Sequence, residues 1–309
     1  MRNYIIRRIL FIIPILIGIT FISFLLINLN TSDPAEVALR VNEITPTDEA
    51  VAAMREELGL DKPFFERYII WLGNSLRFDF GNSYINNKSV SDEMLSALPA
   101  TLYLAAIALI MILGISIVAG ILCAIFEDSI GDKIIRGIIF VGTAMPNFWV
   151  GLLLMWLFAV KLDLFPTSGM SGFSSVILPA ATLSLSYISI YTRLIRNNMI
   201  QNKNENYVLY TRIRGLKNWA VTKHIFRNSI QSSITALGMS IPKLIAGTVI
   251  VENIFAWPGI GRLCVSAIFN RDYPIIQAYI VMMALLFVVC NLIVDIISAS
   301  LDPRIRRTT

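Results

Sequence analysis

The stretch ILFIIPILIGITFISFLLINL, residues 9–29, holds 21 residues without a charge. A helix that crosses the hydrocarbon core of a bilayer needs about 20 mostly apolar residues, so this stretch alone predicts a membrane-spanning helix. The whole chain agrees, because 56% of its residues are hydrophobic and only 15% are charged, against roughly 25% charged in a soluble domain. Composition therefore excludes an ordinary soluble fold and predicts an all-α, polytopic membrane protein.

Six apolar stretches are candidates for spans. Two of them contain a single charge, which is Arg136 in the third and Lys243 in the fifth. The fourth is the weakest prediction, because it is short and is interrupted by Ser184, Ser186 and Ser189. The six predicted spans are residues 9–29, 98–126, 134–160, 177–192, 230–251 and 275–294.

The first span follows Arg2, Arg7 and Arg8, as the apolar core of a secretory signal peptide would. Its apolar run, however, exceeds the length of about 7–15 residues that is typical of a signal sequence. No convincing small-residue cleavage site follows it. We therefore expect an uncleaved membrane anchor.

Basic residues predict the orientation, because Lys and Arg concentrate on the cytoplasmic side of membrane proteins. With a cytoplasmic N-terminus, the inner segments hold 16 basic residues and the short outer loops hold three. Both termini and the loop 193–229 are therefore predicted to be cytoplasmic. Residues 31–97 form the one long extracytoplasmic segment, and residues 1–309 are expected to form a single transmembrane domain.

Two helices are predicted in the long outer segment. The first starts at about Thr47, where Thr47, Asp48 and Glu49 suit an N-cap and a helix dipole, and it ends at Gly59. The second carries an apolar, aromatic face that either lies at the membrane surface or packs on the spans. The residues of this face are Phe64, Phe65, Tyr68, Ile69, Trp71 and Leu72.

The stretch YTRIRGLKNWAVTKHIFRN, residues 210–228, is strongly basic and has no acidic residue. Gly215 divides it, because glycine adopts the left-handed conformation that ends a helix. Residues 206–214 and 218–226 are predicted to be two short helices of a helix–turn–helix knob. A solvated, positive-inside loop would explain the charge alone. Apolar residues such as Leu209 and Trp219 favour a surface that a cytosolic partner covers.

The same loop resembles the cytoplasmic motif of ABC importer permeases, E-A-A-x(3)-G-x(9)-I-x-L-P, which forms the coupling helix seated in a groove of the ATPase. Here Gly215 is followed after nine residues by Ile225. Leu209-Tyr210-Thr211 replace E-A-A and Arg227-Asn228 replace L-P, which are departures usual in the peptide and nickel branch. The motif on its own is a weak signal.

Other segments extend the resemblance over nearly the whole chain, in order and at the family's spacing. They include "LGLDKPFFERYIIWL", "DFGNS", "LPATLYLA", "MPNFWVGLLL", "VENIFAWPGIGRL" and "LDPRIRR". The chain is thus similar to the dipeptide/oligopeptide/nickel permease family of ABC importers. "FNRDYP" together with "FVVCNLIVD" resembles most closely its nickel and metal–metallophore members.

The resemblance implies a transport subunit and not an enzyme, so no catalytic residue is assigned. The chain lacks a G-x-x-x-x-G-K-[ST] phosphate loop, and ATP and Mg²⁺ would be bound by two separate ATPase subunits, with no cofactor on this chain. The other implied partners are a second, homologous permease, an extracytoplasmic substrate-binding protein and the lipid of the bacterial cytoplasmic membrane, but no nucleic acid. The residues implied in ATPase coupling are Tyr210, Thr211, Arg212, Arg214, Gly215, Leu216, Ile225 and Arg227.

Polar residues in the spans are candidates for the translocation pathway. Pro146 removes a helix hydrogen bond, and Asn147 either lines a polar path or satisfies the backbone that the proline frees. Ser184 and Ser186 either line the pathway or support close helix packing. Lys243 is a costly intramembrane charge, which contacts an anionic substrate, pairs with another subunit or snorkels to the surface.

The segment between spans five and six, ENIFAWPGIGRL, has two interpretations. Its aromatic residues suit an anchor in the membrane interface. The resemblance instead implies a re-entrant gate below the binding protein. The residues of the implied extracytoplasmic gate are Glu252, Phe255, Trp257, Pro258 and Gly259.

The sequence predicts no metal site. Nickel and similar ions favour imidazole or thiolate ligands, but the only histidine, His224, lies in the basic loop and the three cysteines are far apart. We therefore expect a transition metal such as nickel to travel as a metallophore complex, with di- or oligopeptide import as the alternative. A membrane enzyme is disfavoured because the sequence shows no set of catalytic residues. An ion channel is disfavoured because the sequence shows no filter-type loop.

Overall fold

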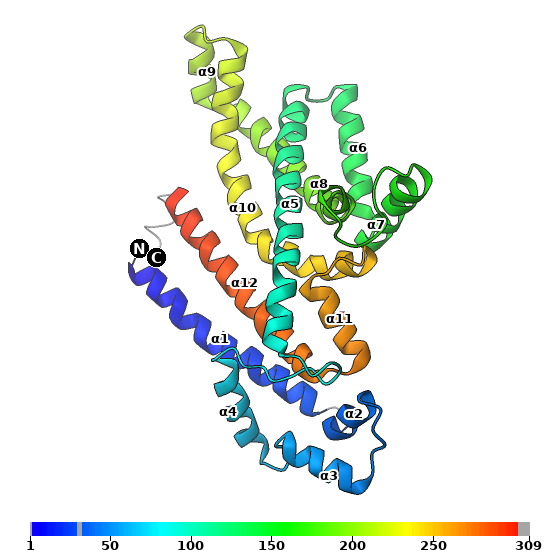
Figure 1. Ribbon diagram of the computed structural model, residues 1–309. Coiled ribbons are helices and arrows are strands. Elements are labelled where there is room, and N and C mark those ends of the chain that lie inside the picture. The colour runs from blue at the N-terminus through cyan, green and yellow to red at the C-terminus, as the bar shows by residue number, and fades with distance from the viewer. Residues whose placement is uncertain (1, 30–32, 302–309) are drawn as a thin grey trace. The chain divides into compact units, whose positions relative to one another are not determined.

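The computed structural model describes residues 2–29 and 33–301, and these residues form helices, connected by turns and one isolated bridge between Asn82 and Ser89 (Figure 1). Among the described residues, five helices are long and apolar enough to cross a membrane, or six if one bent pair counts as a single span. The predicted all-α, polytopic class is confirmed. The helices are α1 (Arg2–Asn28), α2 (Pro34–Val41), α3 (Asp48–Glu57), α4 (Phe64–Ser75), α5 (Val90–Ile125), α6 (Ile130–Ala144), α7 (Asn147–Leu154), the π-helix η1 (Met155–Lys161), α8 (Phe173–Lys203), α9 (Asn206–Ile213), α10 (Asn218–Ile254), α11 (Ile260–Asn270) and α12 (Tyr273–Leu301).

The third predicted span is not one continuous helix. The chain leaves the helix at Met145, which is extended, and restarts after Pro146, so that α6 and the pair α7–η1 meet at a bend of 110°. The cause is local, because proline disfavours a helical conformation at the residue before it and cannot donate the helix hydrogen bond. Pro146 therefore ends one helix and caps the next. Pro146 thus lies between two helices, whereas its sequence position had placed it inside the third predicted span.

The fourth predicted span, the weakest from its sequence, is the most buried of the five. Within its apolar window 56% of α8 is buried, against 11–33% for the other four. The serines that lowered the hydropathy of this span are small enough for close helix packing. Their hydroxyls are satisfied within the helix itself, since Ser184 donates to the carbonyl of Ala181 and Ser189 donates to that of Leu185.

The chain forms two compact units, each made of two main segments. Among the described residues, the first comprises those up to Thr101 together with Pro258–Leu292, and the second comprises Leu102–Trp257 together with residues 293–301. Helices α5 and α12 each contribute to both units. The units are described separately below.

In the first unit, the start of α5 packs on α11 and α12 around a buried cluster. The carboxylate of Asp272 is fully buried between α11 and α12. It accepts hydrogen bonds from the hydroxyl of Ser83, at 2.5 Å, and from the backbone N–H of Tyr84, at 3.3 Å. The turn before α5 is thereby fastened to the start of α12. The cluster consists of Phe80, Val90, Met94, Ile260, Ala267, Ile275, Ala278 and Met282.

The segment of this unit that was predicted to be extracytoplasmic contains the two helices expected from its sequence and one that was not expected. Thr47 caps α3 by accepting a hydrogen bond from the N–H of Ala50, and Gly59 follows the helix with a φ of 63°. The additional helix is α2, which Asp33 caps at the N–H of Ala35. Arg55 of α3 pairs with Asp33 at 2.7 Å and so joins the two helices.

In the second unit, α8 is the central helix and packs against α6, α7 and α10. Glycines permit the closest approaches, which is a common solution in membrane proteins. A Cβ atom at Gly120 of α5 would lie 2.7 Å from the Ile195 side chain of α8, and one at Gly142 of α6 would lie 2.9 Å from the Ser189 hydroxyl. Side chains larger than hydrogen at these two positions would push the helices apart.

Candidate coupling site

The predicted knob exists, but only its first helix is separate. Helix α9 ends at Ile213, and Gly215 takes a φ of 73° while its N–H donates to the carbonyl of Arg212. This is the left-handed closure that favours glycine. The second helix was expected to end near residue 226. Instead α10 runs on as one 37-residue helix to Ile254, so the knob is directly continuous with the fifth span.

The inner face of the knob is a hydrophobic core. Val208 of α9, together with Val221 and Ile225 of α10, packs against Ala124 of α5 and against Ile195 and Met199 of α8. Ile225 is thus buried. The spacing of nine residues between Gly215 and Ile225 serves the packing of the knob on its own unit, and Leu216 is partly buried against the same core.

The outer face of the knob is exposed and is both apolar and basic. Its largest apolar side chains are Leu209, Tyr210, Ile213 and Trp219, of which Trp219 is 73% exposed. The ammonium group of Lys223 lies 5.2 Å from the centre of the Trp219 ring. Thr211 is half-buried, and its hydroxyl donates to the carbonyl of Val208. We call the exposed side chains of Leu209, Tyr210, Arg212, Ile213, Arg214, Lys217, Trp219, Lys223 and Arg227 the coupling face.

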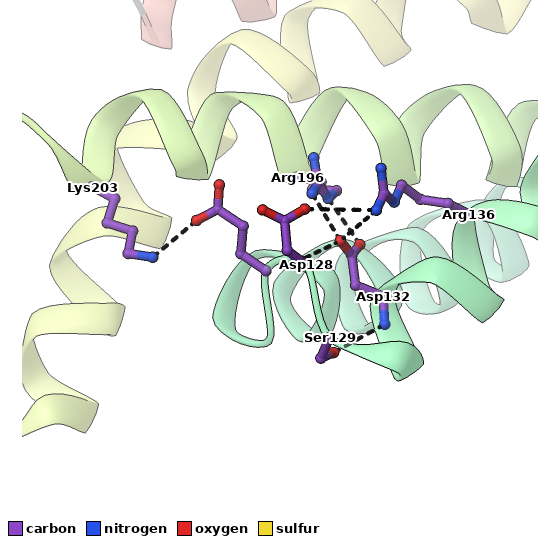
Figure 2. A network of polar contacts seen from close by, with 7 residues as sticks. Asp128, Ser129, Asp132, Arg136, Arg196 and Lys203 are labelled. Atoms are coloured by element: carbon purple, nitrogen blue, oxygen red, sulfur yellow. Dashed lines mark hydrogen bonds and ion pairs between the residues drawn. The ribbon is translucent and has the colours of Figure 1, made fainter.

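An ion-pair network fixes the neighbouring turn between α5 and α6 (Figure 2). The side chain of Asp132, in the first turn of α6, is 0% exposed. Arg196 of α8 donates to both of its oxygens, from Nε at 2.9 Å and from Nη2 at 2.8 Å. Such bidentate, charge-assisted pairs are among the strongest hydrogen-bonded contacts.

Further contacts complete the network, in which Asp132 is the central acceptor. Nη2 of Arg136 lies 3.3 Å from Asp132 Oδ2, and the backbone N–H of Asp128 donates to the same oxygen at 3.1 Å. Beside it, Lys203 donates to Glu127 at 3.0 Å. The turn between α5 and α6 is thus joined to the last turns of α8, the helix that leads into α9.

Asp132 and Arg196 were not among the residues predicted from the sequence. One local signal was present, because Ser129 and Asp132 have the spacing of a helix N-cap, and the Ser129 hydroxyl does accept from the Asp132 N–H at 3.2 Å. That signal marks the start of α6 only. The arginine that pairs with Asp132 lies 64 residues further along the chain, and no local pattern identifies it.

The predicted pathway residues do not form one group in this chain. Pro146 is exposed and Asn147 is half-buried at the break between α6 and α7, whereas Ser184 is fully buried and Ser186 is half-buried. The burial of Ser184 and its bond to Ala181 favour the packing alternative for this residue. Their roles in transport stay predictions.

Lys243 lies in the middle of α10, directly after Pro242, and its side chain is exposed. Among the side chains that the structure describes, none forms an ion pair with it. The charge is therefore free to meet a partner outside this chain.

Around the predicted gate, Phe255 and Trp257 are 1% and 0% exposed. The Trp257 ring stacks on Tyr103 with 6.2 Å between ring centres, and the backbone N–H of Trp257 donates to the carbonyl of Glu252. Glu252 is fully buried as well. The alternative of an aromatic anchor in the membrane interface is therefore wrong for these two rings, which lie inside the second unit.

The rest of the predicted gate starts α11. Gly259 is the N-cap of this helix, and the N–H of Ile260 donates to the hydroxyl of Thr101 at 2.9 Å. Pro258 precedes that cap. Helix α11 has 11 residues and is too short to span a membrane. A re-entrant segment would have such a length. The role of this segment as a gate stays a prediction.

His224 is exposed on the first turns of α10, as expected. Among the residues that the structure describes, no three His, Cys, Asp or Glu side chains gather into a group that could hold a metal ion. Cys123 and Cys264 are buried as small apolar side chains, and Cys290 is half-buried.

The long apolar helices make this chain a polytopic, all-helical membrane protein. The chain belongs to the family described as the binding-protein-dependent transport system inner membrane component, which matches residues 116–307, and the N-terminal component of the same system matches residues 1–105. It is thus a multi-pass inner-membrane permease subunit of a bacterial ABC importer, and it is not itself catalytic.

Several curated relatives match over almost their whole length. The chain is 38% identical over 308 residues to the metal-staphylopine import system permease protein CntB of Staphylococcus aureus, with 99% of each chain covered. It is 40% identical over 317 residues to the oligopeptide transport system permease protein AppB of Bacillus subtilis, again with 99% of each covered. The glutathione transport system permease protein GsiC of Escherichia coli is 32% identical over 307 residues, with the same coverage.

Two solved structures share the fold at low sequence identity. The inward-facing MetNI methionine ABC transporter has a chain with a TM-score of 0.57 and 11% identity, covering 68% of this chain and 96% of that one. An amino acid ABC transporter crystallised with histidines gives 0.51 and 17%, covering 69% and 94%. Both matches concern the fold alone.

Proposed function

We propose that this permease imports nickel or another transition metal as a complex with a small organic chelator. The identity of 38% with the metal-staphylopine permease, over 99% of both chains, is the observation that carries the proposal. A chelated ion also suits a chain with a single histidine, because the chelator supplies the nitrogen and oxygen ligands that the ion prefers. The 40% identity with an oligopeptide permease supports the alternative, import of di- or oligopeptides.

In this proposal the chain pairs with a second permease, and two ATPase subunits bind ATP and Mg²⁺. The coupling face docks in a groove of one ATPase. Because Val221 and Ile225 share a core with Ala124 and Ile195, a push on that face moves the ends of α5, α8 and α10 together. The Asp132–Arg196 pair adds α6 to the same moving block. ATP-driven closure of the ATPases would thus change the accessibility of the pathway.

The substrate is tested by measuring cellular nickel, cobalt and zinc by mass spectrometry in cells with and without this gene. The cells grow in metal-poor medium, with and without an added chelator. Chelator-dependent metal loss on deletion, restored by the intact gene and insensitive to excess peptide, is the expected result. Unchanged metal together with lost uptake of a labelled peptide would replace the metal substrate by a peptide.

The matched control for this measurement is a strain that carries Gly215→Val in the otherwise intact gene. If the coupling face works as proposed, this strain retains the permease in the membrane but takes up no more metal than the deletion strain. A defect of uptake with normal membrane levels separates failed coupling from failed folding.

A further inference from the structure

Helix α4 carries two adjacent apolar stripes, which together make an apolar face wider than its contact with one neighbouring helix needs. With 3.6 residues per turn, Phe64, Tyr68 and Trp71 form one stripe, and Phe65, Ile69, Leu72 and Leu76 form the second. The remaining, mainly polar stripe holds Glu66, Arg67 and Asn74, together with the exposed Ile70. A helix that needed only to pack on its own protein would need one apolar stripe.

The first stripe packs on α1. The Phe64 ring lies 5.3 Å from Phe24, the Tyr68 ring lies 5.3 Å from Phe21, and the Trp71 ring lies 5.6 Å from Phe24. The Tyr68 hydroxyl donates to the carbonyl of Ile17 at 3.3 Å and lies 3.1 Å from the Thr20 hydroxyl. Both apolar packing and buried hydrogen bonds therefore hold α4 on this helix.

The second stripe is exposed. Phe65, Ile69 and Leu76 are 68%, 67% and 76% exposed. These are large aliphatic and aromatic side chains on a regular helix, and nothing described in this unit covers them. In water such a row would be unfavourable, at about 25 cal/mol for each Å² of apolar surface.

The contacts on α1 give the depth of α4. Helix α1 is a candidate span that ends at Asn28, and at 1.5 Å per residue Phe24 lies about 6 Å inside that end and Ile17 about 16 Å inside it. Since the hydrocarbon core is about 30 Å thick, the Tyr68 hydroxyl reaches nearly to its middle. The rings of α4 that surround Phe24 lie at the depth of about 5–10 Å that is typical of interfacial helices.

The polar stripe marks the boundary of the membrane. Nη2 of Arg67 donates to the side-chain oxygen of Asn28 at 2.5 Å, at the last residue of α1. Long basic side chains place their charge at the interface while their stems stay in apolar surroundings. The Arg67–Asn28 contact therefore lies at the level where lipid headgroups begin.

We propose that the Phe65–Ile69–Leu76 stripe of α4 inserts among the acyl chains of the leaflet next to the C-terminal end of α1, which is the outer leaflet in the predicted orientation. Part of the long segment 31–97, expected to be extracytoplasmic, is then embedded in lipid. The occupant of the stripe is hydrocarbon, because the stripe has no polar member and lies on a helix whose partner, α1, is itself a span. Helix α4 thus widens the membrane contact of α1 and fixes its tilt.

The test places a nitroxide on the stripe in the assembled transporter, reconstituted in phosphatidylcholine–phosphatidylglycerol vesicles. Ile69→Cys is labelled in a chain whose three native cysteines are replaced by alanine and which still transports. The matched control is Glu49→Cys, an exposed helical position on α3. Power saturation with oxygen, which concentrates in hydrocarbon, and with water-soluble chromium oxalate then measures the depth, calibrated with nitroxide-labelled phospholipids.

The expected result is an oxygen-to-chromium collision ratio severalfold higher at residue 69 than at residue 49. A high chromium oxalate collision rate at residue 69 would overturn the proposal by placing the stripe in water. Protection from both reagents would also overturn it, because the stripe would then be covered by protein, such as a second permease. Loss of metal uptake plays no part in the readout, so the result does not depend on the substrate.

Discussion

Asp132 and Arg196 form a buried bidentate ion pair between α6 and α8, at 2.9 and 2.8 Å. A buried pair of this kind contributes little by existing, since two charges lose their hydration. Breaking it by removing one partner is far more costly, because an uncompensated charge stays buried. The main effect of the pair is therefore to fix the position of α6 along α8, the helix that leads into the knob.

Arg196→Met should destabilise the assembled transporter by about 3–5 kcal/mol, because the Asp132 carboxylate would lose its main donor. Differential scanning fluorimetry of the purified complex measures the change as a lower melting temperature. Arg193→Met, an exposed arginine on the same helix, is the matched control and should leave that temperature nearly unchanged. Adding Asp132→Asn to Arg196→Met should recover part of the loss. Equal melting temperatures for Arg196→Met and Arg193→Met would contradict a stabilising role of the Asp132–Arg196 pair.

The buried carboxyl of Asp272 should make the folding stability of the protein depend on pH. Burial raises the pKa of its carboxyl above the ordinary value, although the hydrogen bonds from Ser83 and Tyr84 oppose the shift. Because the folded chain holds this proton more tightly than the unfolded chain, the stabilisation is complete below the unfolded pKa of about 3.9 and is lost as the pH rises through the raised folded value. Neutral pH therefore carries a penalty at this residue.

Asp272→Asn should remove that penalty, because an amide is neutral at every pH and still caps α12. From the unfolded carboxyl pKa of about 3.9 up to neutral pH, the variant should show a flatter dependence of melting temperature on pH than the unchanged protein. Asp61→Asn, at an exposed carboxylate, is the control. If the two variants share the pH profile of the unchanged protein, Asp272 does not titrate in this range.

Two glycines of α5 should respond oppositely to alanine. At Gly120 a Cβ atom would lie 2.7 Å from the Ile195 side chain, whereas at Gly114 nothing lies within 4 Å. Gly120→Ala should therefore lower the melting temperature, because α5 and α8 must separate. Gly114→Ala should leave it unchanged or raise it, since alanine in a helix is favoured over glycine by roughly 0.5–1 kcal/mol. Equal effects would mean that α5 and α8 are not in contact there.

The spans were largely predictable because they follow from length and hydropathy, which are local properties. The position of the break at Met145 and Pro146 was predictable, because a proline lies there. The bend of 110° between the two helices was not predictable, because whether a proline kinks a helix or separates it into two depends on what packs around it. Helix α10 shows the converse. Residues 218–226 were separated from the span because their composition changes from basic to apolar, yet no helix-ending residue stands between them.

The candidate site divides in the same way. Gly215 was predicted to be the turn between two helices because it is a glycine, and its φ of 73° agrees. That Ile225 is a core residue of the knob follows only from the structure. The buried state of Phe255 and Trp257 was not predictable, because aromatic residues near the end of a span suit an interface or a core equally well. Asp132 and Arg196 required a contact between segments that are far apart in the sequence.

Substitutions of Gly215 should reduce uptake to different degrees, according to how well the new residue adopts the left-handed backbone conformation. Its φ of 73° is left-handed and a Cβ atom there would touch nothing within 4 Å, so a side chain meets no clash and only the backbone preference opposes it. That preference is about 1–2 kcal/mol for most residues and smaller for asparagine. Gly215→Asn should keep ATP-driven uptake, whereas the β-branched Gly215→Val should lose it.

ATP hydrolysis by the purified complex in vesicles, measured together with uptake, completes this test. Gly215→Val should either lower hydrolysis, if the ATPase no longer docks, or leave hydrolysis without uptake, if docking persists without coupling. Uptake by Gly215→Val at the level of Gly215→Asn would refute the assignment of this turn to coupling.

Lys243 is a charge in the middle of α10 that is exposed in this chain, and an intramembrane charge is maintained only when it faces a cavity or a partner. If it contacts an anionic group of the cargo, Lys243→Met should abolish most uptake while the permeases and ATPases still copurify in unchanged ratio. Lys243→Arg keeps the positive charge and should retain part of the uptake. Loss of the second permease from the purified complex would instead identify an ion pair between subunits, because breaking such a pair removes a contact of assembly and not of transport. Normal uptake by Lys243→Met would assign the lysine to neither role, and its ammonium group would then have to reach the membrane surface along its own four-carbon stem.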